Sequence, residues 1–198
     1  MNKNQPKNLI LRLRAGHIGP KMGRLALIMG LFVSLFMGQF SGVARADDLP
    51  APLPVKKLEM ALPDTAISDQ HGADVRLSDF KGTPLLVNFW ATWCAPCVHE
   101  LPALEAAAKA LDTEMQLLLV SMDRGSPARP AAFLEERGII SAFTAYDAKA
   151  TWARALSVRG LPTSLILSHD QTQAWIVSGP AEWDDKKILN QLRGLLAE

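Results

Sequence analysis

The only two cysteines of the chain lie two residues apart, within Trp93-Cys94-Ala95-Pro96-Cys97. A dense apolar run, from Leu85 to Trp90, precedes them. From about Pro96 to Leu111, apolar side chains recur at the three- and four-residue spacing of a helix. The pattern predicts a buried strand that leads into a helix, with both cysteines at the junction.

This position favours redox chemistry at the cysteines. Free backbone N–H groups and the positive end of the helix dipole stabilise a thiolate on Cys94, at the helix N-terminus. Cys97 lies one helical turn further along, within bonding reach of Cys94. The pair can therefore cycle between dithiol and disulfide, and the neighbouring Trp93 and Pro96 strengthen this interpretation.

Two plainer interpretations compete with redox chemistry. The cysteines could form a structural disulfide, but closing so short a ring removes little loop entropy. They could also form half of a zinc site, but structural zinc usually takes four ligands, and the sequence has no second cysteine pair. The sequence therefore predicts a redox disulfide and no metal site.

Length and charge limit the range of functions. The 198 residues allow one ordinary domain plus an extension, and the formal net charge is +1. No basic block follows the N-terminal segment, so nucleic acid is not an expected partner. A lone cysteine pair suits an oxidising compartment, where stray thiols are a liability.

The N-terminal segment has the layout of an export signal. Its charged residues up to Arg24 are all basic, an apolar stretch follows, and Ala44-Arg45-Ala46 is a small-x-small cleavage site. We expect a signal over residues 1–46, cleaved near Ala46. The alternative is an inner-membrane anchor over 25–43, which approaches the ~20 residues that span a bilayer. Either way, the domain is expected to be periplasmic, since the basic flank stays inside.

Residues 47–57 contain Pro50, Pro52 and Pro54, and this composition predicts an extended linker outside the core. The folded domain is expected to span residues 58–198. Its first part, from Glu59 to Phe80, predicts two short strands around the turn at Asp69-Gln70-His71-Gly72.

Strands and helices alternate over the rest of the chain. The further strands are expected at Met115–Met122, Phe143–Tyr146, Thr163–Leu167 and Ala174–Val177. The further helices are expected at Pro127–Arg137, Lys149–Leu156 and Asp184–Leu196. This order predicts an α/β fold in which a mixed central sheet carries helices on both faces.

From about Leu58 to Leu196 the chain resembles the thioredoxin-like fold, and in particular the TlpA/ResA-like family of exported thiol–disulfide oxidoreductases. The stretch Leu77–Cys97 is similar to the central signature of that family, and Arg159-Gly160-Leu161-Pro162-Thr163 is similar to its second signature. The helix and strand expected between Pro127 and Tyr146 stand where the family carries an insertion.

The resemblance implies roles for particular residues. Pro162 would follow a cis peptide bond, which proline alone makes at low cost. Leu161 would then present backbone N–H and C=O groups to an extended substrate, beside Trp93 and Pro96. Glu100, three residues after Cys97, matches an acidic residue that influences the active cysteines in the ResA-like branch.

The sequence also departs from its relatives in two places. Thioredoxin buries an Asp in the strand before its cysteines, whereas Asn88 stands here and cannot take up a proton. The cytochrome c maturation branch has Pro-Glu-Thr at the cis-proline, whereas this chain has Pro162-Thr163-Ser164. The second departure weakens the case for haem-protein substrates.

These features predict an exported protein disulfide reductase. Cys94 would attack a substrate disulfide and Cys97 would resolve the mixed disulfide, with Glu100 or water accepting the proton of Cys97. No organic cofactor is needed, and the resemblance implies a membrane electron donor of the DsbD or CcdA type. The alternative is a copper-binding or copper-site-assembly module, because soft thiolates suit Cu(I). A third reading is an interaction domain with a vestigial cysteine pair.

Overall fold

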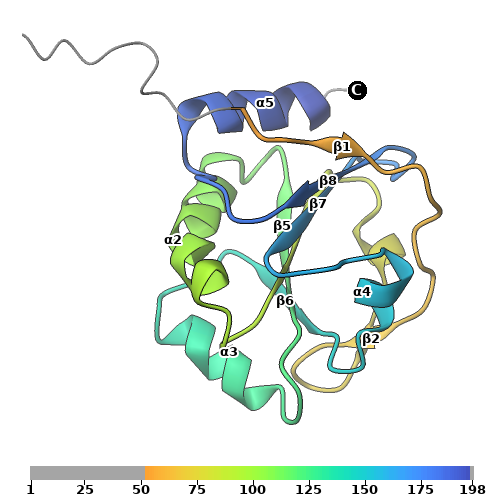
Figure 1. Ribbon diagram of the computed structural model, residues 1–198, viewed down its shortest axis with the longest axis vertical. Helices are drawn as coiled ribbons and strands as arrows, with labels where there is room; N and C mark the ends of the chain where they lie inside the picture. Colours follow the sequence, from red (N-terminus) through yellow and green to blue (C-terminus); the bar gives the residue numbers. More distant parts are fainter. Residues whose placement is uncertain (1–51, 197–198) are drawn as a thin grey trace, which may run out of the picture. The chain divides into compact units, whose positions relative to one another are not determined.

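A mixed sheet of eight strands forms the centre of residues 52–196, the part of the chain that this computed structural model describes (Figure 1). The strands are β1 (Lys56–Lys57), β2 (Ile67–Ser68), β3 (Asp74–Val75), β4 (Leu85–Trp90), β5 (Gln116–Ser121), β6 (Phe143–Tyr146), β7 (Thr163–Leu167) and β8 (Ala174–Ser178). The helices are the 3₁₀ turn η2 (Leu77–Phe80) and the α-helices α2 (Ala95–Ala110), α3 (Ala128–Glu135), α4 (Thr151–Ala155) and α5 (Lys186–Leu196).

The strand order is β1-β8-β7-β4-β5-β6-β2-β3. Strands β4, β5 and β6 run parallel to one another, and every other pair is antiparallel. The predicted α/β architecture is confirmed, including the hairpin before β4 and the inserted α3 and β6. All six residues of β4 are buried, as expected of a central strand covered on both faces.

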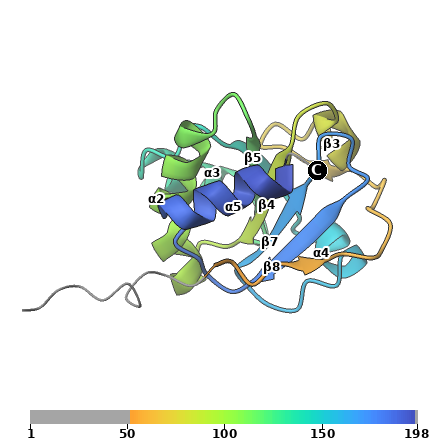
Figure 2. The same ribbon diagram turned by 90° about the horizontal axis from the view of Figure 1, so that it is seen from above.

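Alternate side chains of β4 point to opposite faces of the sheet. Leu86 and Trp90 join a core with residues of α2, α3 and α5, whereas Leu85 and Phe89 pack with residues of η2 and α4. Figure 2 shows α2, α3 and α5 grouped on one side of the sheet and α4 on the other. Asn88 has the parity of Leu86, so its side chain points toward α2.

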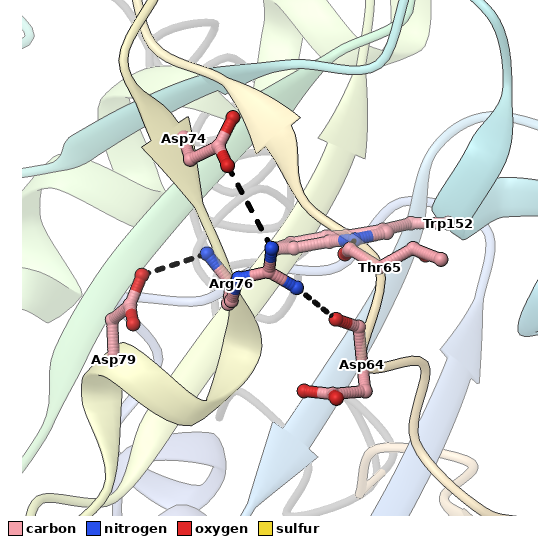
Figure 3. A network of polar contacts seen from close by, with 6 residues as sticks. All are labelled: Asp64, Thr65, Asp74, Arg76, Asp79 and Trp152. Carbon is pink, nitrogen blue, oxygen red and sulfur yellow. Dashed lines mark hydrogen bonds and ion pairs between the residues drawn. The ribbon is translucent and has the colours of Figure 1, made fainter.

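Polar contacts order the segment around β2 and β3, and one of them links it to α4 (Figure 3). The Arg76 guanidinium donates to the Asp64 carbonyl and pairs with Asp74 at 3.6 Å. On α4, the indole N–H of Trp152 donates to the Thr65 carbonyl at 2.7 Å. The Trp152 bond links the loop before the hairpin to α4, and the hairpin itself joins the sheet through the pairing of Ser68 with Tyr146.

The domain begins earlier than the sequence predicts. Leu53 is buried in the core, and Gln191 on α5 both donates to and accepts from its backbone, at 3.1 and 2.8 Å. Lys56 and Lys57 form β1, which pairs with Ile176 and Trp175 of β8. The expectation of a free linker up to residue 57 is therefore wrong for residues 53–57, because strand pairing overrides their proline-rich context.

The expected export signal at 1–46 and the alternative anchor at 25–43 lie outside the described residues. Among residues 52–196, none of the helices has both the length and the apolar character needed to cross a bilayer.

Candidate active site

Cys94 and Cys97 are joined by a disulfide at the junction of β4 and α2. Cys94 is the N-cap of α2, and its sulfur accepts a weak hydrogen bond from the Cys97 N–H at 3.4 Å. Its carbonyl accepts the first helical bond, from the Val98 N–H. Cys94 keeps 6% of its surface exposed and Cys97 keeps none. Cys94 is therefore the more exposed residue of the pair.

Strand pairing brings the second signature to the cysteines. Phe89, near the end of β4, pairs with Thr163, the first residue of β7. The loop that precedes β7 therefore meets the loop that follows β4. The peptide bond between Leu161 and Pro162 in this loop is cis. The Pro162 carbonyl accepts from the Gly179 N–H at 3.0 Å, which links the loop to the end of β8.

Glu100 is a buried carboxylate on the same face of α2 as Cys97, with 3% of its surface exposed. It accepts hydrogen bonds from the Asn88 amide at 2.8 Å, the Ala181 N–H at 3.0 Å and the Trp183 indole N–H at 3.1 Å. This burial shows that Glu100 is not an exposed surface carboxylate of the helix.

Burial raises the pKa of Glu100 above its usual 4.5, while the three donors from Ala181, Asn88 and Trp183 act in the opposite direction. The amide of Asn88 donates to Ser164 as well as to Glu100, and its oxygen has no partner. The Asn88 amide nitrogen therefore faces the Glu100 carboxyl group, as a donor to a carboxylate must.

Asp123 is a second buried carboxylate near the cysteines, and the sequence did not single it out. It accepts from the Thr92 backbone N–H at 2.9 Å, the Thr92 hydroxyl at 2.6 Å and the Ser121 hydroxyl at 2.9 Å. Asp123 thereby fixes the loop that carries the cysteines to the end of β5. The only feature of the sequence that could have pointed to Asp123 is its position directly after a buried strand.

The remaining predicted residues differ in exposure. Trp93 is 66% exposed and projects beside Leu161, with which it lines a surface hollow. Pro96 is exposed in the first turn of α2, and Pro162 is buried. Trp183 is fully buried and was missed, because nothing in its local sequence links it to Glu100, 83 residues earlier.

The fold and the cysteine site define a class: a thioredoxin-fold protein with a Cys-x-x-Cys disulfide at the N-terminus of a helix. The chain belongs to the AhpC/TSA family, whose family model matches residues 58–175.

Curated relatives narrow the resemblance within that family. The thiol-disulfide oxidoreductase ResA of Geobacillus thermodenitrificans is 28% identical over 126 residues, which are 63% of this chain and 71% of the relative. The protein of the same name from Bacillus subtilis is 26% identical over 118 residues, 59% of this chain and 65% of the relative. These matches confirm the predicted resemblance to ResA-like oxidoreductases.

Solved structures of other proteins have the same fold. A Chlorobium tepidum protein assigned as a thiol:disulfide interchange protein DsbE has a TM-score of 0.59 at 27% identity, over 68% of this chain and 94% of its own. A secreted Mycobacterium tuberculosis disulfide oxidoreductase has a TM-score of 0.54 at 18% identity, over 68% of this chain and 95% of its own. The second likeness, at this identity, shows the thioredoxin-like fold alone.

Proposed function

We propose that this domain reduces disulfide bonds of other exported proteins through the Cys94–Cys97 pair. The observation that carries the proposal is the pair itself: a disulfide at a helix N-terminus, with Cys94 more exposed than the fully enclosed Cys97. The thiol–disulfide oxidoreductases among the relatives support the same chemistry.

The reaction takes two steps that balance in atoms and electrons. The Cys94 thiolate attacks one sulfur of the substrate disulfide, forms a mixed disulfide and releases the other substrate sulfur as a thiolate. Cys97 then loses its proton, attacks the sulfur of Cys94 and releases the second substrate thiolate. The substrate gains two electrons, and the domain is left with the Cys94–Cys97 disulfide.

Burial and helix position assign the two roles. Cys94 is the attacking thiol, because it is the more exposed residue and stands where the helix N-terminus stabilises negative charge. Cys97 is enclosed and can meet only the sulfur beside it, which suits a resolving thiol. Leu161, which precedes the cis bond to Pro162, offers its backbone N–H and C=O groups to the substrate strand, with Trp93 and Pro96 at the edge of the contact.

Glu100 is proposed to accept the proton of Cys97, directly or through one water. The two residues share the buried face of α2, and the raised pKa of Glu100 makes proton uptake easier near neutral pH. Asn88 cannot serve as an acid, but its amide holds the Glu100 carboxyl group in place.

Cellular context completes the proposal. The basic and apolar layout of residues 1–46 supports export to the periplasm, either with cleavage near Ala46 or with 25–43 kept as an inner-membrane anchor. A reductant in an oxidising compartment needs a continuous electron supply. We assign that supply to a membrane donor of the DsbD or CcdA type.

A redox titration tests the direction of electron flow. A potential close to the thioredoxin value of about −270 mV supports a reductant, whereas a value near the −120 mV of a strong oxidant contradicts it. Reduction of a protein disulfide by wild type, but not by Cys94→Ala, is the matched activity test. Tight stoichiometric Cu(I) binding without any reductase activity would instead favour the copper-site alternative.

A further inference from the structure

A hollow of about 500 Å³ opens beside the active site, between the cysteine loop and the loop that leads to Pro162. Trp93 and Leu161 form its wall toward the cysteines, and Met122 and Val158 add apolar surface. Trp93 directly precedes Cys94, so the hollow lies next to the position that a substrate bound covalently to Cys94 would take.

All charged side chains that line the hollow are basic: Arg124, Lys149, Arg154 and Arg159. All four are exposed, and none of the ion pairs found among residues 52–196 includes them. The concentration is local, since acidic residues outnumber basic ones between residues 52 and 196. The rim therefore has a positive charge that the domain as a whole does not have, and this charge attracts an acidic partner.

Two buried carboxylates lie next in sequence to lining residues and reduce the positive charge of the rim. Asp123 is occupied by Thr92 and Ser121. Asp147 accepts from the backbone N–H groups of Thr151 and Ala153 at the start of α4. Because both carboxylates are buried and hydrogen-bonded, they leave the four exposed cations available to a ligand.

The backbone that carries this rim is held in an uncommon conformation. Ala150 lines the hollow, precedes α4 and has a φ of 52°, in the left-handed region that a non-glycine residue rarely adopts. This turn sets the course of the chain between Lys149 and Arg154. Such local strain is often retained where it serves binding.

A second, larger hollow of about 1080 Å³ shares residues 158–161 with the first. Its charged rim is mixed, since Glu59 lies there with Lys56, Lys57 and the shared Arg159, whereas the smaller hollow has cations only. It offers no comparable selection by charge, so the smaller hollow is the better candidate for a specificity site.

We propose that this basic hollow selects protein substrates by binding an acidic segment next to the substrate disulfide. The inference rests on the proposed reductase function, because it assumes that Cys94 attacks a disulfide. A concave site with apolar walls fits side chains of a peptide. A flat anionic membrane surface fits it less well, and would cover Trp93 and the cysteines.

Three synthetic peptides with the same internal disulfide, flanked by glutamates, serines or lysines, test the proposal. Their rates of oxidising the reduced wild-type domain are followed by tryptophan fluorescence. We expect the acidic peptide to react about tenfold faster than the serine peptide at low salt, within the range of electrostatic steering. The advantage should shrink as salt rises, because exposed charges are screened.

Variants that remove charge show which residues cause the preference for the acidic peptide. Lys149→Gln combined with Arg154→Gln, and separately Arg124→Gln, should lose most of the preference for the acidic peptide. Two different elements carry these residues, so a distortion of α4 alone cannot explain both losses. The matched control, Lys186→Gln with Lys187→Gln, removes two exposed cations that do not line the hollow, and should keep the full preference.

Equal rates for the three peptides in wild type, or a preference that survives in both pocket variants, would overturn the proposal. So would binding to phosphatidylglycerol vesicles that depends on these cations while the peptides react alike. Reduction of the uncharged hydroxyethyl disulfide by wild type separates the two claims. If that reaction is absent, the reductase function itself fails; if it proceeds without charge preference, only the acidic-segment inference fails.

Discussion

Where thioredoxin buries an Asp in the strand before its cysteines, this chain has Asn88. The buried carboxylate Glu100 lies on helix α2 instead. The Asn88 amide bridges Glu100 and Ser164, at 2.8 and 2.9 Å, so the polar cluster joins α2 to β4 and β7. A carboxylate in this cluster is partly shielded from water, and its charge therefore acts more strongly on neighbouring sulfurs than a surface charge would.

Glu100→Gln tests the influence of that charge. Removing a negative charge near the cysteines should increase the fraction of Cys94 present as thiolate at a given pH, because like charge disfavours ionisation. It should also slow release of the mixed disulfide, perturbing the proton transfer from Cys97. Thiolate absorbance and exchange rates across the pH range provide the measurement. Curves that superimpose on wild type would contradict the role, and Glu135→Gln, at an exposed position of α3, is the control.

The same carboxyl group makes stability depend on pH. Its pKa is raised in the folded state, mainly by burial, so the folded protein binds the proton more tightly than the unfolded chain. This contribution is present below the usual value of 4.5 and is lost as pH rises through the folded pKa. In the oxidised protein, the free energy of unfolding of wild type minus that of Glu100→Gln should therefore fall with rising pH. A difference that rises with pH would contradict the assigned shift.

Asp123 is expected to hold the loop before the cysteines. Asp123→Ala removes both acceptor oxygens, so the buried N–H and hydroxyl of Thr92 lose the carboxylate to which they donate. The cost should be about 1–3 kcal/mol of unfolding free energy, with faster hydrogen exchange at the Thr92 amide. Asp112→Ala, at an exposed position, is the control. Unchanged exchange at Thr92 would show that Asp123 does not anchor the loop.

At the scale of elements, the sequence predicted most of the sheet and its helices. The strands at Phe143–Tyr146 and Thr163–Leu167 lie where expected, because each is rich in β-branched, aromatic or other apolar residues and is bounded by turn residues. Strand β1 was missed, since its two lysines carry no hydrophobic pattern. Its conformation comes from pairing with β8, more than a hundred residues later.

The sequence likewise predicted one part of the candidate site and missed another. Local spacing was enough to place Cys94, Cys97 and Glu100 on one helix. The partners of Glu100 at Ala181 and Trp183 come from a distant segment. Single-sequence spacing contains no information on such long-range contacts, so the burial of Glu100 could not be predicted.

The contact between Leu53 and α5 gives a test at the element scale. Leu53→Ala should reduce the free energy of unfolding by about 2–5 kcal/mol, the range for a buried leucine truncated in a packed core. Urea denaturation measures the change. Met60→Ala, at a substantially exposed position, should cost far less. Equal and small effects at both positions would mean that the segment before Leu58 does not pack on the core.

At the scale of the whole molecule, the fold brings the Cys94–Cys97 disulfide and the loop with the cis Leu161–Pro162 bond to the same end of β4 and β7. The helices on both faces leave that end open at Trp93 and the neighbouring basic hollow. In the proposed function the molecule meets another protein at the cysteine pair, and the intermediate that defines this function is a covalent one.

Trapping that intermediate tests the central claim most directly. The full chain with Cys97→Ala, expressed in the exported compartment, cannot resolve its mixed disulfides, and the adducts are identified by mass spectrometry after non-reducing separation. We predict substrate proteins linked through Cys94 in this variant and none in the matched Cys94→Ala variant. An absence of adducts with Cys97→Ala, or equal adducts in both variants, would contradict the assignment of Cys94 as the attacking thiol of a disulfide reductase.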